Sequence, residues 1–319
     1  MTTGELKRAL AAAVQAARRT GLLMRRNLGF AKKIVARSRH DIKLELDVRC
    51  QRIIETILLG AFPESELLGE EGMAGAAGAS LRWVVDPIDG TVNFTYGVPH
   101  ACVSIALQER GERLPRTFDA PCAHEPPRVS SPSPPHTCGG EGRGEEDSSQ
   151  FMERPGDYST SLGVVYDPFC DELWTAARGA PARLNGKIIH VSRRKDLALA
   201  MVAIGFAKDA ESLRENLPVF NVLVRRALKI RMTGSAALAL AYVACGRFDA
   251  YLESGIWIWD IAAGGFILER AGGDFWRRPI AGRHKYRMLA DNGWLRRKVQ
   301  RAAREARRGI ADCGLRIAD

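Results

Sequence analysis

The sequence predicts a mixed α/β fold built in layers, and three observations support this prediction. Residues 6–28 and 45–59 repeat apolar positions at helical spacing, which is typical of amphipathic helices. Residues 81–85 form a short apolar run of the kind that makes a buried strand. Predicted strands and helices alternate in the second half of the chain, and this alternation favours a layered α/β unit.

The remaining elements follow in order along the chain. Residues 101–107 predict a second apolar strand, and residues 163–168 and 172–176 predict a hairpin whose turn spans 167–171. Beyond the hairpin, strand-like runs are separated by helical periodicity. These later elements are strands at 201–206, 227–231 and 248–253, and helices at 215–226, 235–245, 261–270 and 295–308.

Length and composition bound the class of protein. The chain has 319 residues, of which 46% are hydrophobic, so it can bury a full core in one large domain or two closely packed ones. It has no run of eighteen apolar residues and no secretory pattern at its N-terminus, so we expect a cytoplasmic protein that does not span a membrane. Its 7 cysteines include no C-x-x-C pair, which argues against a disulfide framework or a zinc site.

The net charge of +10 is concentrated at the two ends of the chain. A basic helix at residues 295–308 could bind RNA or an acidic partner through its cations. The alternative, which we favour, is a solvated helix face, because Trp294 is the only aromatic residue nearby and no nucleic-acid-binding motif is present. The basic residues of this helix are Arg296, Arg297, Lys298, Arg301, Arg304, Arg307 and Arg308, against Glu305 alone.

Residues 113–160 interrupt the pattern of strands and helices. They are rich in proline, serine, glycine and charged residues, with almost no apolar periodicity, so they cannot build a core. We interpret them as a disordered hairpin insertion, which the fold can tolerate because loop closure costs only about 0.6 kcal/mol per doubling of length. The other interpretation is translated sequence that does not belong to the gene product.

Carboxylates cluster around an Asp-Pro-Ile-Asp-Gly-Thr motif that follows the strand at 81–85. The turn can direct its two carboxylates and one carbonyl at a common point, and oxygen donors of this kind suit Mg²⁺. Each piece alone could be a surface turn or a solvated helix start. The candidate ligands are Glu70, Asp86, the carbonyl of Ile88, Asp89 and Asp260.

The order of the motifs resembles that of a known family. Glu70, the motif at 86–91, Gly234-Ser235-Ala236-Ala237 and Trp259-Asp260 together resemble the inositol monophosphatase family, which also holds fructose-1,6-bisphosphatases. The resemblance extends from about residue 6 to residue 273, with one interruption. It implies an αβαβα sandwich and a homodimer. We expect an N-terminal subdomain at 1–112 and 161–195, a C-terminal subdomain at 196–293, and a basic helix and tail at 294–319.

The resemblance also implies a metal-dependent phosphomonoesterase with two or three Mg²⁺ ions. Glu70, Asp86 and the Ile88 carbonyl would bind the first ion, Asp86, Asp89 and Asp260 the second, and Glu70 a weaker third. The backbone N–H groups of Gly90 and Thr91 would bind phosphate. Glu70, Thr91 and Asp47 would be catalytic, with Asp47 accepting a proton from the threonine. The residues that would contact substrate are Asp89, Gly234, Ser235, Ala236, Glu253 and Asp260.

The expected substrate is myo-inositol 1-phosphate or a similar small sugar phosphate, with inhibition by lithium. One departure from the family pattern affects the loop at 41–47, where Lys43 and Leu44 stand in place of valine and threonine. A fructose-1,6-bisphosphatase or a 3′-phosphoadenosine phosphatase is an alternative within the same class. An alternative from another class is a binding protein that acts through RNA or the transcription machinery.

Overall fold

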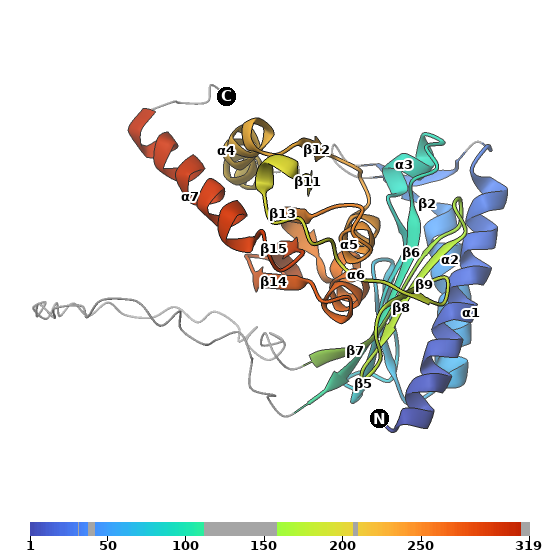
Figure 1. Cartoon of the computed structure of the whole chain (residues 1–319). Helices are drawn as coiled ribbons and strands as arrows, with labels where there is room; N and C mark the ends of the chain where they lie inside the picture. Colours follow the sequence, from blue (N-terminus) through green and yellow to red (C-terminus); the bar gives the residue numbers. More distant parts are fainter. Residues whose placement is uncertain (31, 38–41, 112–157, 207–209, 314–319) are drawn as a thin grey trace, which may run out of the picture.

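The computed structural model describes residues 1–30, 32–37, 42–111, 158–206 and 210–313, and it arranges them in alternating layers of helices and sheets. An eight-stranded sheet and a five-stranded sheet are separated by one pair of helices, and each sheet has helices on its outer face (Figure 1). The αβαβα sandwich predicted from the sequence is confirmed.

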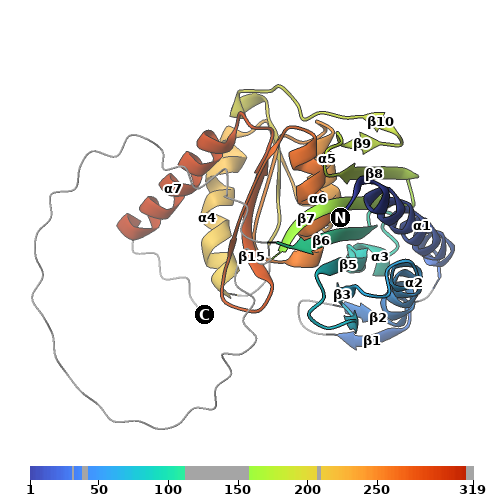
Figure 2. The ribbon, with the colours of Figure 1, turned by 90° about the horizontal axis from the view of Figure 1, so that it is seen from below.

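Helices α1 (Thr3–Asn27) and α2 (Glu45–Ala61) cover the outer face of the eight-stranded sheet (Figures 1 and 2). Both follow from the apolar periodicity of the sequence. The start of α1 is fixed by a capping box, in which the Thr2 hydroxyl accepts a hydrogen bond from Glu5 N at 3.2 Å. The inward face of α1 is rich in buried alanines, which allow the helix to pack closely on the sheet.

The eight-stranded sheet has the strand order β10-β9-β8-β7-β6-β5-β3-β4, and its pairs are antiparallel except for β3 with β5. Its central strands are buried on both faces, because helices lie on either side of them. The strands are β3 (Glu66–Gly69), β4 (Gly72–Gly75), β5 (Leu81–Asp89), β6 (Cys102–Arg110), β7 (Tyr158–Asp167), β8 (Glu172–Ala177), β9 (Arg183–Leu184) and β10 (Lys187–Ile188).

The insertion predicted at 113–160 falls between β6 and β7, which pair with each other down to Arg110 and Tyr158. Residues 113–157 lie outside the described part of the chain. Residues 158–160 belong to β7, so the strand begins earlier than the sequence suggested. The register of β6 with β7 shows that the chain leaves and re-enters the sheet at neighbouring positions.

Helices α5 (Ala236–Ala244) and α6 (Ile258–Arg270) form the layer between the sheets, and small residues let this layer pack tightly. A Cβ atom added to Gly163 of β7 would lie 2.7 Å from the backbone oxygen of Ala263 in α6. A Cβ atom on Gly264 would similarly lie 2.7 Å from Leu240 Cβ in α5. These close approaches fix the position of α6, whose first turn contributes to the site described below.

The five-stranded sheet has the order β12-β11-β13-β15-β14, with α4 (Ala210–Arg226) and α7 (Arg296–Cys313) on its outer face. Its strands are β11 (Met201–Ile204), β12 (Lys229–Arg231), β13 (Ala250–Trp257), β14 (Asp274–Pro279) and β15 (Lys285–Asp291). The sequence predicted β11, β12 and β13 but missed the β14–β15 hairpin, because arginines interrupt its apolar alternation.

Smaller elements complete the described chain. These are the hairpin of β1 (Ile34–Arg37) and β2 (Ile42–Leu44), the short helix α3 (Thr91–Thr95) and the 3₁₀ turn η2 (Leu197–Leu199). None of the helices in the described residues has the length and apolar character needed to cross a membrane.

The close contact of β7 with α6 generates a stability prediction. We expect Gly163→Ala to lower the free energy of unfolding by about 1–3 kcal/mol, because its methyl group would overlap the backbone of Ala263. Gly60→Ala in α2 is the matched control, since nothing lies within 4 Å of its added Cβ. Urea unfolding should show the control unchanged or slightly stabilised. Equal stability of the two variants would contradict the tight packing.

Candidate metal centre

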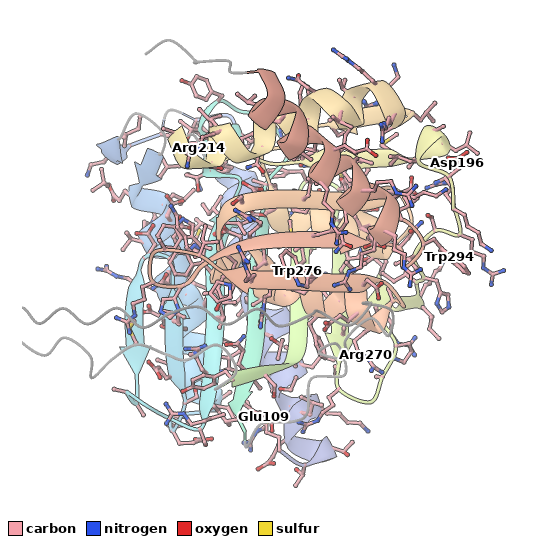
Figure 3. The ribbon with its side chains drawn as sticks, turned by 90° about the vertical axis from the view of Figure 1, so that its left-hand side faces the viewer. Glu109, Asp196, Arg214, Arg270, Trp276 and Trp294 are labelled. Atoms are coloured by element: carbon pink, nitrogen blue, oxygen red, sulfur yellow. The ribbon has the colours of Figure 1, made fainter. Side chains whose placement is uncertain are left out.

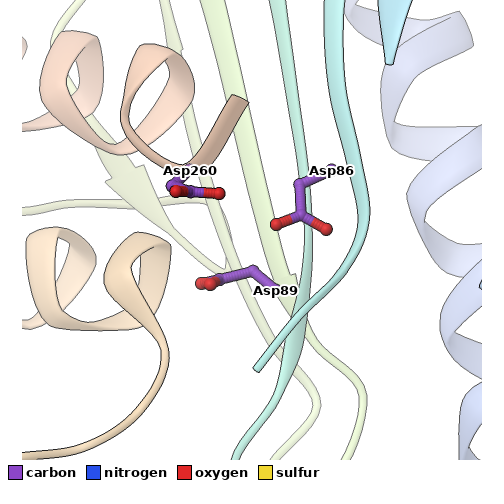
Figure 4. A group of neighbouring side chains, drawn as sticks. All are labelled: Asp86, Asp89 and Asp260. Carbon is purple, nitrogen blue, oxygen red and sulfur yellow. The ribbon is translucent and has the colours of Figure 1, made fainter. Parts of the chain in front are cut away.

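Three carboxylates from two layers of the fold converge on one point. Asp86 and Asp89 come from the end of β5, and Asp260 comes from the first turn of α6. One oxygen from each lies within 4.8 Å of the other two. Figure 4 shows the three side chains grouped between the strand and the helix. The convergence predicted from the sequence motif is therefore present for these three residues.

An irregularity in β5 allows both of its aspartates to face the same point. Residues three apart in a regular strand lie on opposite faces of the sheet. Here Asp86 pairs with Ser104 while Asp89 pairs with Cys102, so β5 has one more residue than β6 over this step. This bulge turns Asp89 back to the face of Asp86, and Pro87, which has no N–H to donate, is tolerated within it. Ile88 N donates to Asp86 Oδ1 at 2.9 Å.

The N-terminal end of α5 holds the carboxylate of Asp89. The Ser235 hydroxyl and Ala237 N donate to Asp89 Oδ2 at 2.5 and 2.7 Å, and Ala236 N donates to Asp89 Oδ1 at 3.2 Å. Cys102 Sγ, which the sequence did not single out, also donates to Oδ2 at 3.5 Å. Ser235 and Ala236, predicted as substrate contacts, therefore stabilise the negative charge of the Asp89 carboxylate.

Gly234 precedes this helix end in a left-handed conformation, with φ of 73°. The side chain of Asn93 lies against it and donates hydrogen bonds to the carbonyls of Thr233 and His100 at 2.8 and 2.9 Å. A side chain at Gly234 would be strained and would meet Asn93, so glycine is required there. Asn93 thus ties the loop before α5 to the segment after α3, although no sequence motif indicated this.

Asp260 is placed by the geometry of the start of α6. Its Oδ2 atom accepts a hydrogen bond from Trp257 N at 3.0 Å, which closes the first turn of the helix. The Ser104 hydroxyl donates to the carbonyl of Trp259 at 3.1 Å, so α6 is anchored to β6 next to the three converging carboxylates. Trp257 and Trp259 stack with their ring centroids 5.2 Å apart, and Trp257 is 38% exposed.

The carboxylates raise one another's pKa values. Burial raises the pKa of Asp86 well above its ordinary value, and the charges of Glu70, Asp89 and Asp260 raise it further. Burial and the neighbouring carboxylates also raise the pKa of Asp260. For Asp89, burial raises the pKa while the hydrogen bonds from Ser235 and α5 oppose this effect. A divalent cation would relieve this repulsion, and an all-oxygen donor set suits Mg²⁺, so the residues fit the ion that the sequence predicted.

Glu70 and Thr91 lie beside the three aspartates. Glu70 follows β3, where its N–H donates to the carbonyl of Val85 at 3.1 Å, and its carboxyl group shares a hydrogen bond with Asp86. The hydroxyl of Thr91 donates to the Ile88 carbonyl at 2.8 Å. Gly90 immediately precedes α3, whose first residue is Thr91, and it has a φ of 95°. The structure thus gathers these predicted residues, while their roles toward metal and phosphate stay predictions.

Asp47 is buried in the first turn of α2, where Oδ2 accepts a hydrogen bond from Leu44 N at 2.7 Å. The expected pairing of Asp47 with Thr91 stays a prediction. Leu44 marks the departure from the family pattern, and its side chain is fully buried in the core beneath α1 and α2. The apolar residue is therefore accommodated by packing, and the start of α2 is capped by Asp47 instead of a hydroxyl at position 44.

Glu253 lies on β13, close to Asp89. Burial raises its pKa to about 7, the charge of Asp89 raises it too, and a hydrogen bond from the Tyr251 hydroxyl opposes the shift. Gly205 makes room for it, because a Cβ atom at Gly205 would lie 1.7 Å from Glu253 Oε2. The sequence missed Tyr251, although residues two apart in a strand share a face and this spacing could have indicated the contact.

Comparison with known proteins identifies the family to which the chain belongs. The model of the inositol monophosphatase family matches residues 5–114 and 158–304. The chain belongs to the inositol monophosphatase family. The resemblance inferred from the motifs is confirmed, and membership supports phosphatase activity. The two matched ranges leave residues 115–157 between them, in agreement with an insertion relative to the family.

Individual relatives of the chain have two kinds of name. The "Nus factor SuhB" of Xylella fastidiosa is 37% identical over 264 residues, covering 82% of this chain and 78% of the relative. The "Inositol monophosphatase 1" of Solanum lycopersicum is 31% identical over 277 residues, covering 85% and 84%. Among solved structures, the inositol monophosphatase from Anabaena is similar with a TM-score of 0.69 and 30% identity, covering 93% of this chain and 95% of that one.

The raised pKa of Glu253 generates a pH prediction. An acid whose pKa is higher in the folded state lowers stability as pH rises from its ordinary pKa of 4.5 through about 7, because the folded state must then ionise a poorly solvated group. Without added Mg²⁺, Glu253→Gln should be more stable than wild type at pH 8 by roughly 1–2 kcal/mol, and this gain should vanish near pH 4.5. Urea unfolding at several pH values measures it. A gain in stability that does not depend on pH would contradict the raised pKa of Glu253.

Proposed function

We propose that the chain is a Mg²⁺-dependent phosphomonoesterase that hydrolyses inositol monophosphate or a similar small sugar phosphate. The observation that supports this proposal is the convergence of Asp86, Asp89 and Asp260 within 4.8 Å, next to Glu70. A purely structural role would not require four crowded carboxylates, since their mutual repulsion costs stability.

The residues have separate tasks in this proposal. Glu70, Asp86, Asp89, Asp260 and the Ile88 carbonyl would hold two or three Mg²⁺ ions. When bound, the ions supply a water of lowered pKa and neutralise charge on the phosphoryl group.

Other residues near the aspartates would transfer the proton and bind the phosphate. The Thr91 hydroxyl would orient the attacking water and pass a proton toward Asp47, with Glu70 assisting on the other side. The backbone N–H groups of Gly90 and Thr91 would hold a phosphate oxygen at the start of α3. Burial of Asp47 at 3% exposure keeps its carboxylate away from bulk water.

Substrate contacts would lie where β13 and α5 face the carboxylates. Glu253, whose pKa is raised to about 7 by desolvation, would accept hydrogen bonds from substrate hydroxyls, and Asp89 and Asp260 would contact the same hydroxyls. Gly234, Ser235 and Ala236 would line the neighbouring wall. Fructose 1,6-bisphosphate and 3′-phosphoadenosine phosphates are the alternative substrates. Inhibition by lithium, a homodimer and a cytoplasmic location complete the proposal by analogy with the family.

A second candidate function is a role in transcription. It is favoured by the name "Nus factor SuhB", which relatives from Xylella fastidiosa and Pseudomonas aeruginosa bear at 37% and 34% identity. The basic helix α7 is the element through which we propose contact with RNA or an acidic partner. Transcript lengths from a purified transcription reaction, with and without the protein, would test this role, and unchanged lengths would contradict it.

Phosphate release tests the principal proposal. Purified protein with Mg²⁺ should release phosphate from a panel of inositol, sugar and nucleotide phosphates, most rapidly from myo-inositol 1-phosphate. Asp89→Asn should lower kcat/KM by more than roughly a hundredfold, because it removes a charge from the ligand set while keeping its size.

The matched control is Asp196→Asn, since Asp196 is 61% exposed and its replacement can still cap η2. This variant should keep wild-type activity. Mg²⁺-independent release, or equal loss in both variants, would contradict the metal mechanism. Faster release from a bisphosphate would replace the proposed substrate with one of the alternatives.

A further inference from the structure

Two basic segments that are distant in the sequence meet at the surface of the five-stranded half. The loop before η2 contains Arg193, Arg194 and Lys195, and α7 opens with Arg296, Arg297 and Lys298. Lys298 Nζ donates to the carbonyl of Lys195 at 2.6 Å, across a separation of 103 residues. The sequence indicated only the second of these segments as a candidate, so the fold enlarges the basic surface.

Trp294 lies between the two segments and is 53% exposed. Lys195 Nζ is 3.9 Å from the centroid of its ring. The backbone around it is fixed, because Trp294 N donates to Asn292 Oδ1 at 3.1 Å and the Asn292 side chain donates to the Arg194 carbonyl at 2.8 Å. Figure 3 shows Trp294 and Asp196 at the same edge of this face. A single exposed tryptophan needs no explanation, but one held among cations does.

Some of these cations stabilise the fold. Arg194 Nε donates to the buried carboxylate of Asp249 at 2.7 Å, and Arg296 acts on the buried carboxylate of Asp291. By contrast, Arg193, Arg297 and Arg301 are exposed, and within the described residues no acidic side chain pairs with them. Their charge is therefore available to a ligand.

The placement of cations at the start of α7 is electrostatically unfavourable for the helix itself. A helix N-terminus has a partial positive charge that favours acidic residues, and the first turn of α7 has none. The exposed cations then continue along one outward face, since positions 297, 301 and 304 are spaced at four and three residues. They extend over roughly 10 Å of helix, which suits a linear polyanion better than a single phosphate.

We propose that this surface, defined as Arg193, Lys195, Trp294, Arg297, Arg301 and Arg304 and called the Trp294 surface, binds single-stranded nucleic acid. Phosphates lie along the cations, and a base stacks on the indole of Trp294. Proteins that bind single-stranded nucleic acid combine cations, which contact phosphates, with exposed aromatic rings, on which bases stack. Binding of an acidic protein would require the cations alone.

The Trp294 surface is separate from the carboxylates. It is built on α7 and the loop before η2, and α7 lies on the outer face of the five-stranded sheet, whereas Asp86 and Asp89 come from the end of β5 and Asp260 from α6, which lies between the sheets (Figure 1). The inference rests on the second candidate function for its biological setting, and it gives that function a defined surface. Its test requires neither phosphate release nor transcription.

The test is fluorescence anisotropy of a labelled single-stranded oligouridine with the full chain, at about 50 and 200 mM salt. Arg297→Gln with Arg301→Gln should weaken binding roughly tenfold and reduce the slope of log affinity against log salt by about 1.4. Trp294→Ala should weaken binding roughly tenfold and leave that slope unchanged.

The matched control replaces Arg19 and Arg26, two exposed residues of α1, with glutamine, because α1 lies on the opposite side of the molecule from α7 (Figures 1 and 2) and the two changes alter the net charge equally. The control should bind as wild type does. Equal weakening of RNA binding by the control would overturn the inference, because the net positive charge of the protein, and not the Trp294 surface, would then determine the affinity. The inference would also be overturned if polyglutamate displaced the labelled oligouridine as effectively as unlabelled RNA does and Trp294→Ala left the affinity unchanged. The surface would then be one that binds an acidic protein.

Phosphate release measured on the same preparations separates the proposals. Loss of RNA binding in variants that still release phosphate supports the Trp294 surface as a separate site. A wild-type protein that releases phosphate but binds no RNA overturns this inference alone. A wild-type protein that binds RNA as expected but releases no phosphate supports this inference and contradicts the phosphatase proposal alone.

Discussion

The repulsion among four crowded carboxylates, of which Asp86 and Asp89 are buried, is the constraint on which the rest of this structure depends. Asp86, Asp89 and Asp260 place their oxygens within 4.8 Å of one another, with Glu70 hydrogen-bonded to the first. Buried like charges are costly unless a cation or hydrogen bonds offset them. The fold must therefore hold these side chains together against a force that would separate them.

Three features of the fold provide this support. The bulge in β5 turns two aspartates to one face, the end of α5 donates hydrogen bonds to Asp89, and Ser104 of β6 anchors α6 so that Asp260 faces them. The layer of α5 and α6 between two sheets is what brings these groups together from distant parts of the chain. Close packing of Gly163 on α6 shows how little freedom this layer has. The acidic centre is built on β5 and α6, and the basic Trp294 surface on α7 and the loop before η2, so the two come from different elements of the fold.

The sequence predicted the parts of this account that depend on local pattern. Apolar periodicity predicted α1, α2 and the strand leading to Asp86, and the order of short motifs predicted Asp89 and Asp260 as neighbours. It could not predict the hydrogen bond from Cys102 to Asp89, which arises from strand register, or the role of Asn93, which joins two loops. The β14–β15 hairpin was missed because its arginines break the alternation. The meeting of Lys195 with Lys298 depends on tertiary structure alone.

The most direct test of the central claim is the effect of Mg²⁺ on the free energy of unfolding. If the three aspartates form a divalent-cation site, Mg²⁺ should stabilise the wild-type protein by about 2.7 kcal/mol at a hundred times its dissociation constant. Asp260→Asn should lose most of this stabilisation while remaining folded. Wild-type stability that does not change with Mg²⁺, or an equal gain in the Asp260→Asn variant, would contradict the claim that these carboxylates exist to hold a metal.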